Sequence, residues 1–171
     1  LGAKTTLISG PTFIPDPVGP TIVKVKSATE MSDACESLLP TDIAVCAAAV
    51  GDYKISNASP EKIKKSGSKI LIELEENPDV LSRISKRNSQ RPRLVIGFAA
   101  ETENLISNAE KKLKEKGCDW ILANDISNGK IIGQDKNKVH FISLDEKSEW
   151  DTMSKNEVAK KLSDKIVNYF V

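Results

Sequence analysis

The residues best suited to chemistry follow the most apolar segment of the chain. Residues 43–50 read I-A-V-C-A-A-A-V, and Asp52 follows that run closely. Small residues allow a flat base or a ribose to approach the backbone, and a carboxylate can accept hydrogen bonds from hydroxyl or amino groups of a ligand. Ala47, Ala48 and Asp52 are therefore candidate ligand-binding residues. A tightly packed strand end with a turn explains the same residues, and this segment alone favours that second explanation.

A lysine-rich segment comes next, within what the sequence predicts to be a polar loop between Gly51 and Gly67. It carries Lys62, Lys64 and Lys65. Mobile lysines suit phosphoryl chemistry, because they can close over a triphosphate, offset its charge and leave with the product. A charge run in a loop is as often ordinary solvated surface, so the spacing alone leaves both interpretations open.

Two further lysines could face one anion. Lys112 and Lys116 are four residues apart, so they share one face of the helix predicted for residues 102–116. Lys111 and Lys114 make the same helix lysine-rich throughout. A solubilising face is therefore the favoured alternative unless other evidence selects the first pair.

The segment Asn77–Val80 predicts the start of a helix. Asn77 would be the cap, Pro78 would occupy the first helical position, and Asp79 would meet the positive end of the helix dipole. The free amides of such a start can bind a phosphate or the edge of a base. Ordinary capping explains the segment equally well.

Several familiar sites are absent from the sequence. It contains neither the G-x-G-x-x-G fingerprint of dinucleotide-binding folds nor the G-x-x-x-x-G-K-[ST] phosphate loop, which makes a dehydrogenase fragment a poor interpretation. The single histidine, His140, lies within a predicted strand. A histidine-based triad or metal centre is therefore excluded as an explanation, and no metal-binding residues are predicted.

Short apolar runs alternate with amphipathic segments, which predicts an α/β fold with a mostly parallel sheet and helices on both faces, in three layers. The predicted strands are Thr5–Ser9, Thr21–Val25, Asp42–Ala48, Leu94–Ala99, Asp119–Ala123 and Lys138–Ile142. The third and fourth are continuously apolar, so we expect them in the middle of the sheet. In parallel sheets the ligand binds at the carboxyl ends of such strands.

Length and composition fit one domain covering residues 1–171. The 25 basic and 24 acidic side chains give a net charge of +1, so neither nucleic acid nor a membrane is an expected partner. Three cysteines without C-x-x-C spacing favour a reducing cytoplasm. The start at Leu1, without a methionine, suggests that an upstream segment has been removed.

Six segments, in this order, resemble the synthetase domain of phosphopantothenate-cysteine ligase, which in bacteria forms half of a bifunctional coenzyme A biosynthesis protein. They are L-I-S-G-P near the start, Ala48–Tyr53, Glu61–Lys65, Asn77–Val80, Gly97–Thr102 and Ala123–Ser127. Each is weak evidence alone. Together they span nearly the whole chain.

The resemblance implies a Rossmann-like fold, CTP with Mg²⁺ as cofactor, and a homodimer with active sites near the subunit interface. It further implies that 4'-phosphopantothenate is activated as an acyl-cytidylate with release of pyrophosphate, after which cysteine displaces CMP. Any FMN would belong to a separate decarboxylase domain outside this chain.

By position, the resemblance also assigns the site. The residues implied to contact the nucleotide are Cys46, Ala47, Ala48, Asp52, Lys62, Pro78, Asp79, Val80, Leu81, Phe98, Lys112 and Lys116. Among them, Lys62 is implied to be the catalytic lid lysine. Lys112 and Lys116 would face the phosphates, and the ring of Phe98 would pack against the base.

The chain also departs from the family pattern. It lacks the S-S-G-K-M-G loop and the D-P-V-R turn, and in the similar D-P-V of residues 16–18 the arginine position is Gly19. A domain that lacks these parts is expected to bind nucleotide weakly and to turn over poorly alone. A non-catalytic nucleotide-binding or dimerisation module with the same fold is therefore the alternative.

Overall fold

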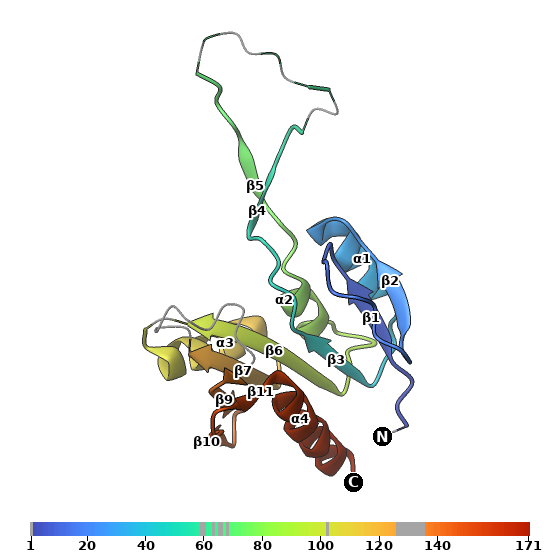
Figure 1. Ribbon diagram of the computed structural model, residues 1–171, viewed down its shortest axis with the longest axis vertical. Helices are drawn as coiled ribbons and strands as arrows, with labels where there is room; N and C mark the ends of the chain where they lie inside the picture. Colours follow the sequence, from blue (N-terminus) through green and yellow to red (C-terminus); the bar gives the residue numbers. More distant parts are fainter. Residues whose placement is uncertain are drawn as a thin grey trace.

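A computed structural model describes residues 2–58, 61, 62, 64, 67, 69–101, 103–125 and 136–171. Its body is built on a five-stranded sheet, with a long two-stranded arm projecting from one side (Figure 1). In spatial order the sheet contains β10 (Lys147–Glu149), β9 (Val139–Ile142), β7 (Trp120–Asp125), β6 (Leu94–Glu101) and β3 (Ile43–Cys46). Within these described ranges, no helix is both long and apolar enough to cross a bilayer.

The strands β3, β6 and β7 run parallel, and β9 and β10 are added antiparallel at one side. Two smaller pairs accompany this sheet: β1 (Thr6–Ser9) with β2 (Thr21–Lys24), which are parallel, and β8 (Lys136–Asn137) with β11 (Met153–Ser154), which are antiparallel. The predicted α/β class with a mostly parallel sheet is therefore confirmed.

Helices cover both faces of the sheet, as predicted. The helices α1 (Ala28–Ser37), α2 (Val80–Ser85) and α3 (Leu105–Lys116) lie on one face, and α4 (Lys155–Phe170) lies on the other. Successive strand residues point to opposite faces, so Val95 and Ile121 join the core on the α1–α3 side, while Ile96 and Leu122 join the core on the α4 side. These four side chains are fully buried.

One predicted position in the sheet is wrong. β3 lies at the end of the five-stranded sheet rather than in its middle, because in the described part of the chain β1 and β2 pair with each other and not with β3. Val45 on β3 is accordingly 48% exposed. An apolar run shows that both faces of a strand can be buried, but it does not state how many strands flank it.

The start of α2 also differs from the prediction. Asp79, not Asn77, is the N-cap, and its carboxylate accepts a hydrogen bond from the Ser82 amide at 2.9 Å. The physical reason is Pro78, since a residue that precedes proline is driven toward extended backbone. Asn77 therefore ends the preceding extended segment instead of starting the helix.

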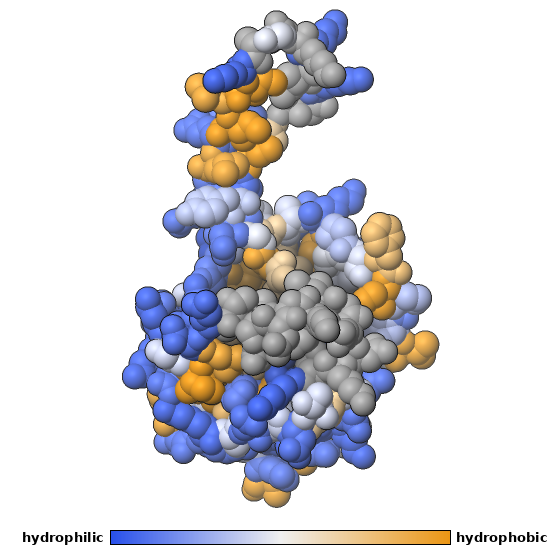
Figure 2. All heavy atoms as spheres, turned by 60° about the vertical axis from the view of Figure 1, so that its left-hand side comes forward, coloured by the Kyte–Doolittle hydropathy of each residue, from blue (hydrophilic) through white to orange (hydrophobic). Residues whose placement is uncertain are grey.

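The segment after β3 forms an arm rather than the predicted polar loop. β4 (Tyr53–Ile55) and β5 (Leu74–Glu76) pair antiparallel and carry the chain away from the body. Cross-strand partners share a face, so Ile55 lies beside Leu74 on one face, and Lys54 lies beside Glu75 on the other. Figure 2 shows apolar side chains gathered along the outer part of this arm.

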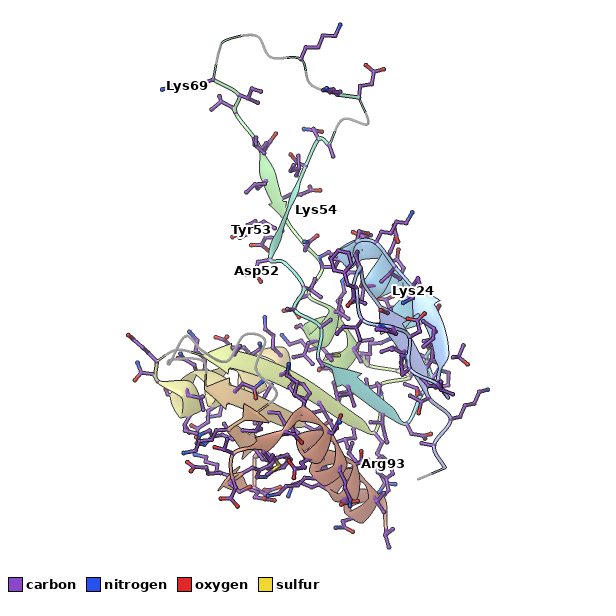
Figure 3. The ribbon with its side chains drawn as sticks, viewed as in Figure 1. Lys24, Asp52, Tyr53, Lys54, Lys69 and Arg93 are labelled. Carbon is purple, nitrogen blue, oxygen red and sulfur yellow. The ribbon has the colours of Figure 1, made fainter. Side chains whose placement is uncertain are left out.

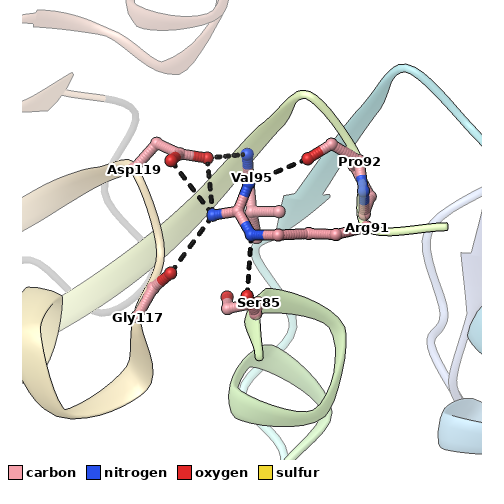
Figure 4. Close-up of polar contacts among 6 residues, drawn as sticks. All are labelled: Ser85, Arg91, Pro92, Val95, Gly117 and Asp119. Atoms are coloured by element: carbon pink, nitrogen blue, oxygen red, sulfur yellow. Dashed lines mark hydrogen bonds and ion pairs between the residues drawn. The ribbon is translucent and has the colours of Figure 1, made fainter. Parts of the chain in front are cut away.

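The carboxyl ends of α2 and α3 are held by a group of hydrogen bonds around Arg91, which we call the arginine cluster (Figure 4). Arg91 donates to the carbonyl oxygens of Ser85 at 2.7 Å, Pro92 at 2.9 Å and Gly117 at 3.2 Å, and to both carboxylate oxygens of Asp119 at 3.0 Å. Asp119 also accepts a hydrogen bond from the Val95 amide at 2.6 Å. One side chain thus joins the carboxyl ends of α2 and α3 to the starts of β6 and β7.

Candidate functional site

The candidate site forms around the start of α2, where Asp79 meets the end of α3. Lys116 Nζ lies 2.5 Å from the second carboxylate oxygen of Asp79. Partial burial of the Asp79 carboxyl opposes its ionisation, but the hydrogen bonds from Lys116 and from the Ser82 amide outweigh this effect and lower the pKa of Asp79. The same bond raises the pKa of Lys116, so both groups are held in their charged forms.

Lys112 lies one turn before Lys116 on α3 and also points inward. Its Nζ donates to the carbonyl oxygen of Phe98 on β6 at 2.9 Å. Lys111, in contrast, is 72% exposed and lies 3.7 Å from Glu115 on the same helix. The structure therefore distinguishes Lys112 and Lys116, which were predicted to share an anion, from Lys111, which lies on the solvated face of the helix.

Asp52 contributes a second carboxylate where the arm leaves the body (Figure 3). It is exposed, and its charge is close enough to Lys116 to help raise the pKa of that lysine. The backbone around it is fixed by Asn77, whose backbone N–H donates to the Asp52 carbonyl at 2.8 Å and whose side-chain amide donates to the Gly51 carbonyl at 2.8 Å. We call Asp52, Asp79, Lys112 and Lys116 the charged cluster.

The small residues after β3 are open rather than packed. Ala47 and Ala48 are both exposed, which contradicts the alternative of a tightly packed strand end. Cys46 is partly buried, and burial, followed by the neighbouring thiols Cys35 and Cys118, raises its pKa to about 12. Reactive cysteines have a lowered pKa, so the raised pKa of Cys46 gives no support for a nucleophilic role.

The residues that follow Pro78 present backbone, because their side chains belong to the core. Val80 and Leu81 are buried on the α1–α3 side of the sheet. Leu81 packs onto the bare backbone of Gly97, where an added Cβ would come within 2.7 Å of a Leu81 methyl and 2.8 Å of an Ile121 methyl. Gly97 thus allows α2 to lie close against β6.

Two predicted site residues do not join the charged cluster through their side chains. The ring of Phe98 packs against the core on the α4 side, so only its carbonyl oxygen reaches Lys112. Lys62 is exposed and lies in the chain between β4 and β5, the two strands of the arm.

Some predicted positions cannot be placed. Lys65, Thr102 and residues 126–127 lie outside the described residues. Sequence reasoning also missed the bridging amide of Asn77, which adjoins the site, and the arginine cluster around Arg91 at the starts of β6 and β7. Neither has a spacing signal, because each depends on carbonyl groups that only the fold brings into reach.

The charged cluster offers two ammonium groups, two carboxylates and an exposed stretch of small residues beside them. This combination can bind a polyanion through the lysines and hydroxyl or amino groups through a carboxylate. In the portions of the chain that the structure describes, no group of three or more His, Cys, Asp and Glu side chains could hold a metal ion.

Comparisons with known proteins identify similar sequences and a similar fold. The coenzyme A biosynthesis bifunctional protein CoaBC of Haemophilus influenzae is 37% identical over 170 residues, which cover 99% of this chain and 42% of that protein. A crystal structure of the C-terminal domain of a CoaBC protein is 31% identical with a TM-score of 0.78, covering 99% of this chain and 77% of that one. The chain thus spans less than half the length of its bifunctional relative.

A structure of a Cab2 variant in complex with phosphopantothenate-cysteine shares the fold at 16% identity, with a TM-score of 0.63 and coverage of 88% of this chain and 55% of that one. The family model of the DNA/pantothenate metabolism flavoprotein C-terminal domain matches residues 1–170. The chain belongs to this family of C-terminal domains.

Proposed function

We propose that this chain is part of a phosphopantothenate-cysteine ligase, which joins cysteine to 4'-phosphopantothenate at the expense of CTP in coenzyme A biosynthesis. Family membership and the similarity to a CoaBC C-terminal domain support this proposal. The observation that carries it is the charged cluster, in which Lys116 pairs with Asp79 and feels the charge of Asp52, while Lys112 on the same helix reaches the Phe98 carbonyl of β6.

The proposed reaction has two steps. In the first, a carboxylate oxygen of 4'-phosphopantothenate attacks the α-phosphorus of CTP, and the bond to the leaving pyrophosphate breaks. In the second, the amino nitrogen of cysteine attacks the activated carbonyl carbon, the bond to CMP breaks, and the nitrogen loses a proton. No protein nucleophile is needed, which agrees with the raised pKa of the Cys46 thiol at the end of β3.

The role of the lysines follows from where charge develops. Negative charge grows on the pyrophosphate as it leaves, so ammonium groups there stabilise the transition state more than the ground state. Lys116 is available for this role only if the nucleotide phosphates replace Asp79 as its partner. Lys112 would likewise exchange the Phe98 carbonyl for a phosphate oxygen.

Mg²⁺ would enter with the nucleotide. Magnesium is usually bound through one or two carboxylates together with substrate phosphates, rather than by a dedicated set of protein ligands. Asp52 is the exposed carboxylate of the charged cluster, whereas Asp79 already serves α2 and Lys116. The residues present therefore fit a metal ion that would be held mainly by the triphosphate and by the Asp52 carboxylate. Such an ion would neutralise part of the phosphate charge.

The nucleoside would lie against backbone rather than against side chains. Exposed Ala47 and Ala48 allow a base or ribose to approach the end of β3, and Gly97, the register partner of Cys46, carries the side chain of Leu81 from the start of α2. Because Phe98 directs its ring to the α4 side, we propose that its carbonyl oxygen, not the ring, takes part. The choice of CTP rather than ATP rests on the family alone.

We further propose that the protein acts as a cytoplasmic homodimer, joined through the arm. The apolar face of the arm carries Tyr53, Ile55 and Leu74, which are 59%, 50% and 56% exposed. Ile70 and Ile72 continue the spacing of two residues back from Leu74, and they are 58% and 65% exposed. An isolated two-stranded ribbon is marginal in water, so a second copy of the same face is the partner that would bury it.

The ligase proposal is tested by assaying the complete protein with CTP, Mg²⁺, 4'-phosphopantothenate and cysteine. We expect pyrophosphate and phosphopantothenoylcysteine to form in equal amounts. The charge-removing change Lys62→Gln should slow pyrophosphate release by about a hundredfold if that lysine offsets transition-state charge. Lys64→Gln, two residues along the same exposed segment, is the matched control and should retain activity.

Two outcomes would count against this assignment. If the complete protein forms no product from these substrates, the chain is a module that keeps the fold without the chemistry. If product forms but Lys62→Gln releases pyrophosphate at the unchanged rate, the ligase function stands and the lid role of Lys62 is wrong.

A further inference from the structure

Asn77 occupies a position that ordinary capping does not explain. It is the last residue of the arm before Pro78, yet it donates two hydrogen bonds backward to successive carbonyl groups on the opposite strand. Its backbone N–H donates to Asp52 and its side-chain Nδ2 donates to Gly51, both at 2.8 Å. One residue therefore fixes the two peptide groups where the chain leaves β3.

The bond to Asp52 continues the register of the arm. Tyr53 pairs with Glu76, and Asp52 with Asn77 is the next pair toward the body. The next position, Gly51 opposite Pro78, is a non-hydrogen-bonded pair of the antiparallel register, so no backbone bond is made there. The side chain of Asn77 donates to the Gly51 carbonyl at this position and extends the connection one residue further.

The same residue adjoins the other half of the charged cluster. Two positions after Asn77, Asp79 caps α2 and pairs with Lys116. Asn77 thus links the segment that carries Asp52 to the segment that carries Asp79. The charges of Asp79 and Asp52 both raise the pKa of Lys116. The hydrogen bonds of Asn77 hold the segments that carry these two carboxylates together.

We propose that Asn77 is a positioning residue, which holds the Asp52 carboxylate at a fixed place relative to Asp79 and Lys116 and so prepares the nucleotide site. The inference rests on the proposed function for its effect on catalysis. The mechanical part, that the amide of Asn77 fixes the root of the arm, depends on the geometry alone.

The chemistry of the side chain makes the proposal specific. An aspartate at this position has the same shape, but its carboxylate would face the Gly51 carbonyl oxygen with no proton to donate, and it would add negative charge beside Asp52. Asn77→Asp should therefore perturb the site at least as much as Asn77→Ala. A role in packing alone would predict the opposite order.

The test compares Asn77→Ala and Asn77→Asp with the unchanged complete protein by steady-state kinetics. We expect the KM for CTP to rise about tenfold while kcat changes less than about twofold, because an orienting residue contributes to binding in ground state and transition state alike. The KM for cysteine should not change. Asn108→Ala is the matched control, because its side-chain amide also donates to a backbone carbonyl, that of Glu103, but away from the arm.

A second readout does not depend on the ligase function. Hydrogen exchange of the backbone amides of residues 51–55 and 74–77 should quicken in both Asn77 variants and remain unchanged in Asn108→Ala. If the complete protein neither binds CTP nor forms product, the proposed function fails while this exchange still decides the mechanical claim. Unchanged exchange at the arm root, or an equal effect of the Asn108 control, would overturn the inference.

Discussion

Asp79 holds two partners at once, and this double role is the main electrostatic feature of the site. One carboxylate oxygen caps α2 through the Ser82 amide, and the other accepts from Lys116. A bound triphosphate would compete for Lys116 but not for the amide. The ion pair can therefore hold Lys116 in place before the nucleotide binds. When the nucleotide takes Lys116, the N-cap hydrogen bond of α2 remains.

The pH dependence of this pair follows from the directions of the two pKa shifts. The lowered pKa of Asp79 means that its contribution to stability is present above the unfolded-state value of about 3.9 and is lost as the pH falls through the folded-state pKa. The raised pKa of Lys116 means that its contribution is present below about 10.4 and is lost as the pH rises through its folded-state pKa.

We therefore predict that Asp79→Asn lowers the free energy of unfolding by up to about 1 kcal/mol near pH 7, since the pair is more than a third exposed and asparagine still caps α2. Urea unfolding at pH 7 and at pH 3 measures this. The difference between the two proteins should shrink at pH 3, which is below the unfolded-state pKa of the carboxyl, because the unfolded chain then binds the proton and part of the stabilisation is lost. An equal difference at both pH values would show that the ion pair is not its cause.

At the scale of elements, the arginine cluster determines how α2 and α3 meet the sheet. Its five donated bonds end on the carbonyl oxygens of Ser85, Pro92 and Gly117 and on both carboxylate oxygens of Asp119. We predict that Arg91→Ala lowers the free energy of unfolding by about 2–3 kcal/mol, because several half-buried acceptors lose a charged donor. Arg91→Lys should recover less than half of this loss, since an ammonium group cannot reproduce the planar fork.

Urea denaturation with an unchanged m value is the measurement for the Arg91 variants. Arg93→Ala provides the control, because Arg93 is exposed and its main contact lies 4.7 Å from its guanidinium, over the ring of Phe170. That change should cost less than about 1 kcal/mol. Equal losses at Arg91 and Arg93 would refute the role given to the cluster.

Elements with strong local signals could be predicted from the sequence. Buried strands such as β6 follow from continuous apolar runs, and α4 follows from its apolar spacing and begins at Lys155, after a capping box of Ser154 and Glu157. Gly117 ends α3 with a φ of 71°, the left-handed conformation that favours glycine at the end of a helix. Each of these features is decided within a few residues of chain.

Features set by distant partners could not be predicted. The edge position of β3 depends on which strand pairs beside it, and the contact of Lys112 with Phe98 depends on the packing of α3 on β6. The arm was missed because β4 is short and charged, although the alternation of Ile72 and Leu74 with Glu73 and Glu75 was a readable sign of a strand. For the site, spacing identified Lys112 and Lys116, but not Asn77 as a bridge.

At the scale of the whole molecule, the arm stands out because its apolar side chains are not buried within a single chain. Its apolar face is exposed along its length, while the opposite face carries the ion pair of Lys54 with Glu75 at 3.2 Å. Apart from Glu76 beside Tyr53, one face of the ribbon is apolar and the other is charged. Such a ribbon is suited to packing its apolar face against another apolar surface. Lys62, which lies between β4 and β5 in the chain, would then lie on the side of the second copy.

We predict that the protein sediments as a dimer and that Leu74→Asp converts it to a monomer, because a charge would be buried at the centre of the apolar face. Lys54→Gln, on the opposite face, should leave the dimer intact. Sedimentation velocity across a range of protein concentrations measures both. A dimer that persists in Leu74→Asp would place the subunit contact elsewhere on the molecule.

The most direct test of the account is a calorimetric titration of the complete protein with CTP and Mg²⁺. We predict saturable binding that weakens at least about tenfold when Lys112 and Lys116 are both changed to glutamine, because each removes a charge-assisted contact to phosphate. The double change of Lys111 and Lys114, on the same helix, should leave the affinity unaltered. Absence of binding by the unchanged protein, or an equal loss in both double variants, would contradict the claim that the charged cluster binds the nucleotide.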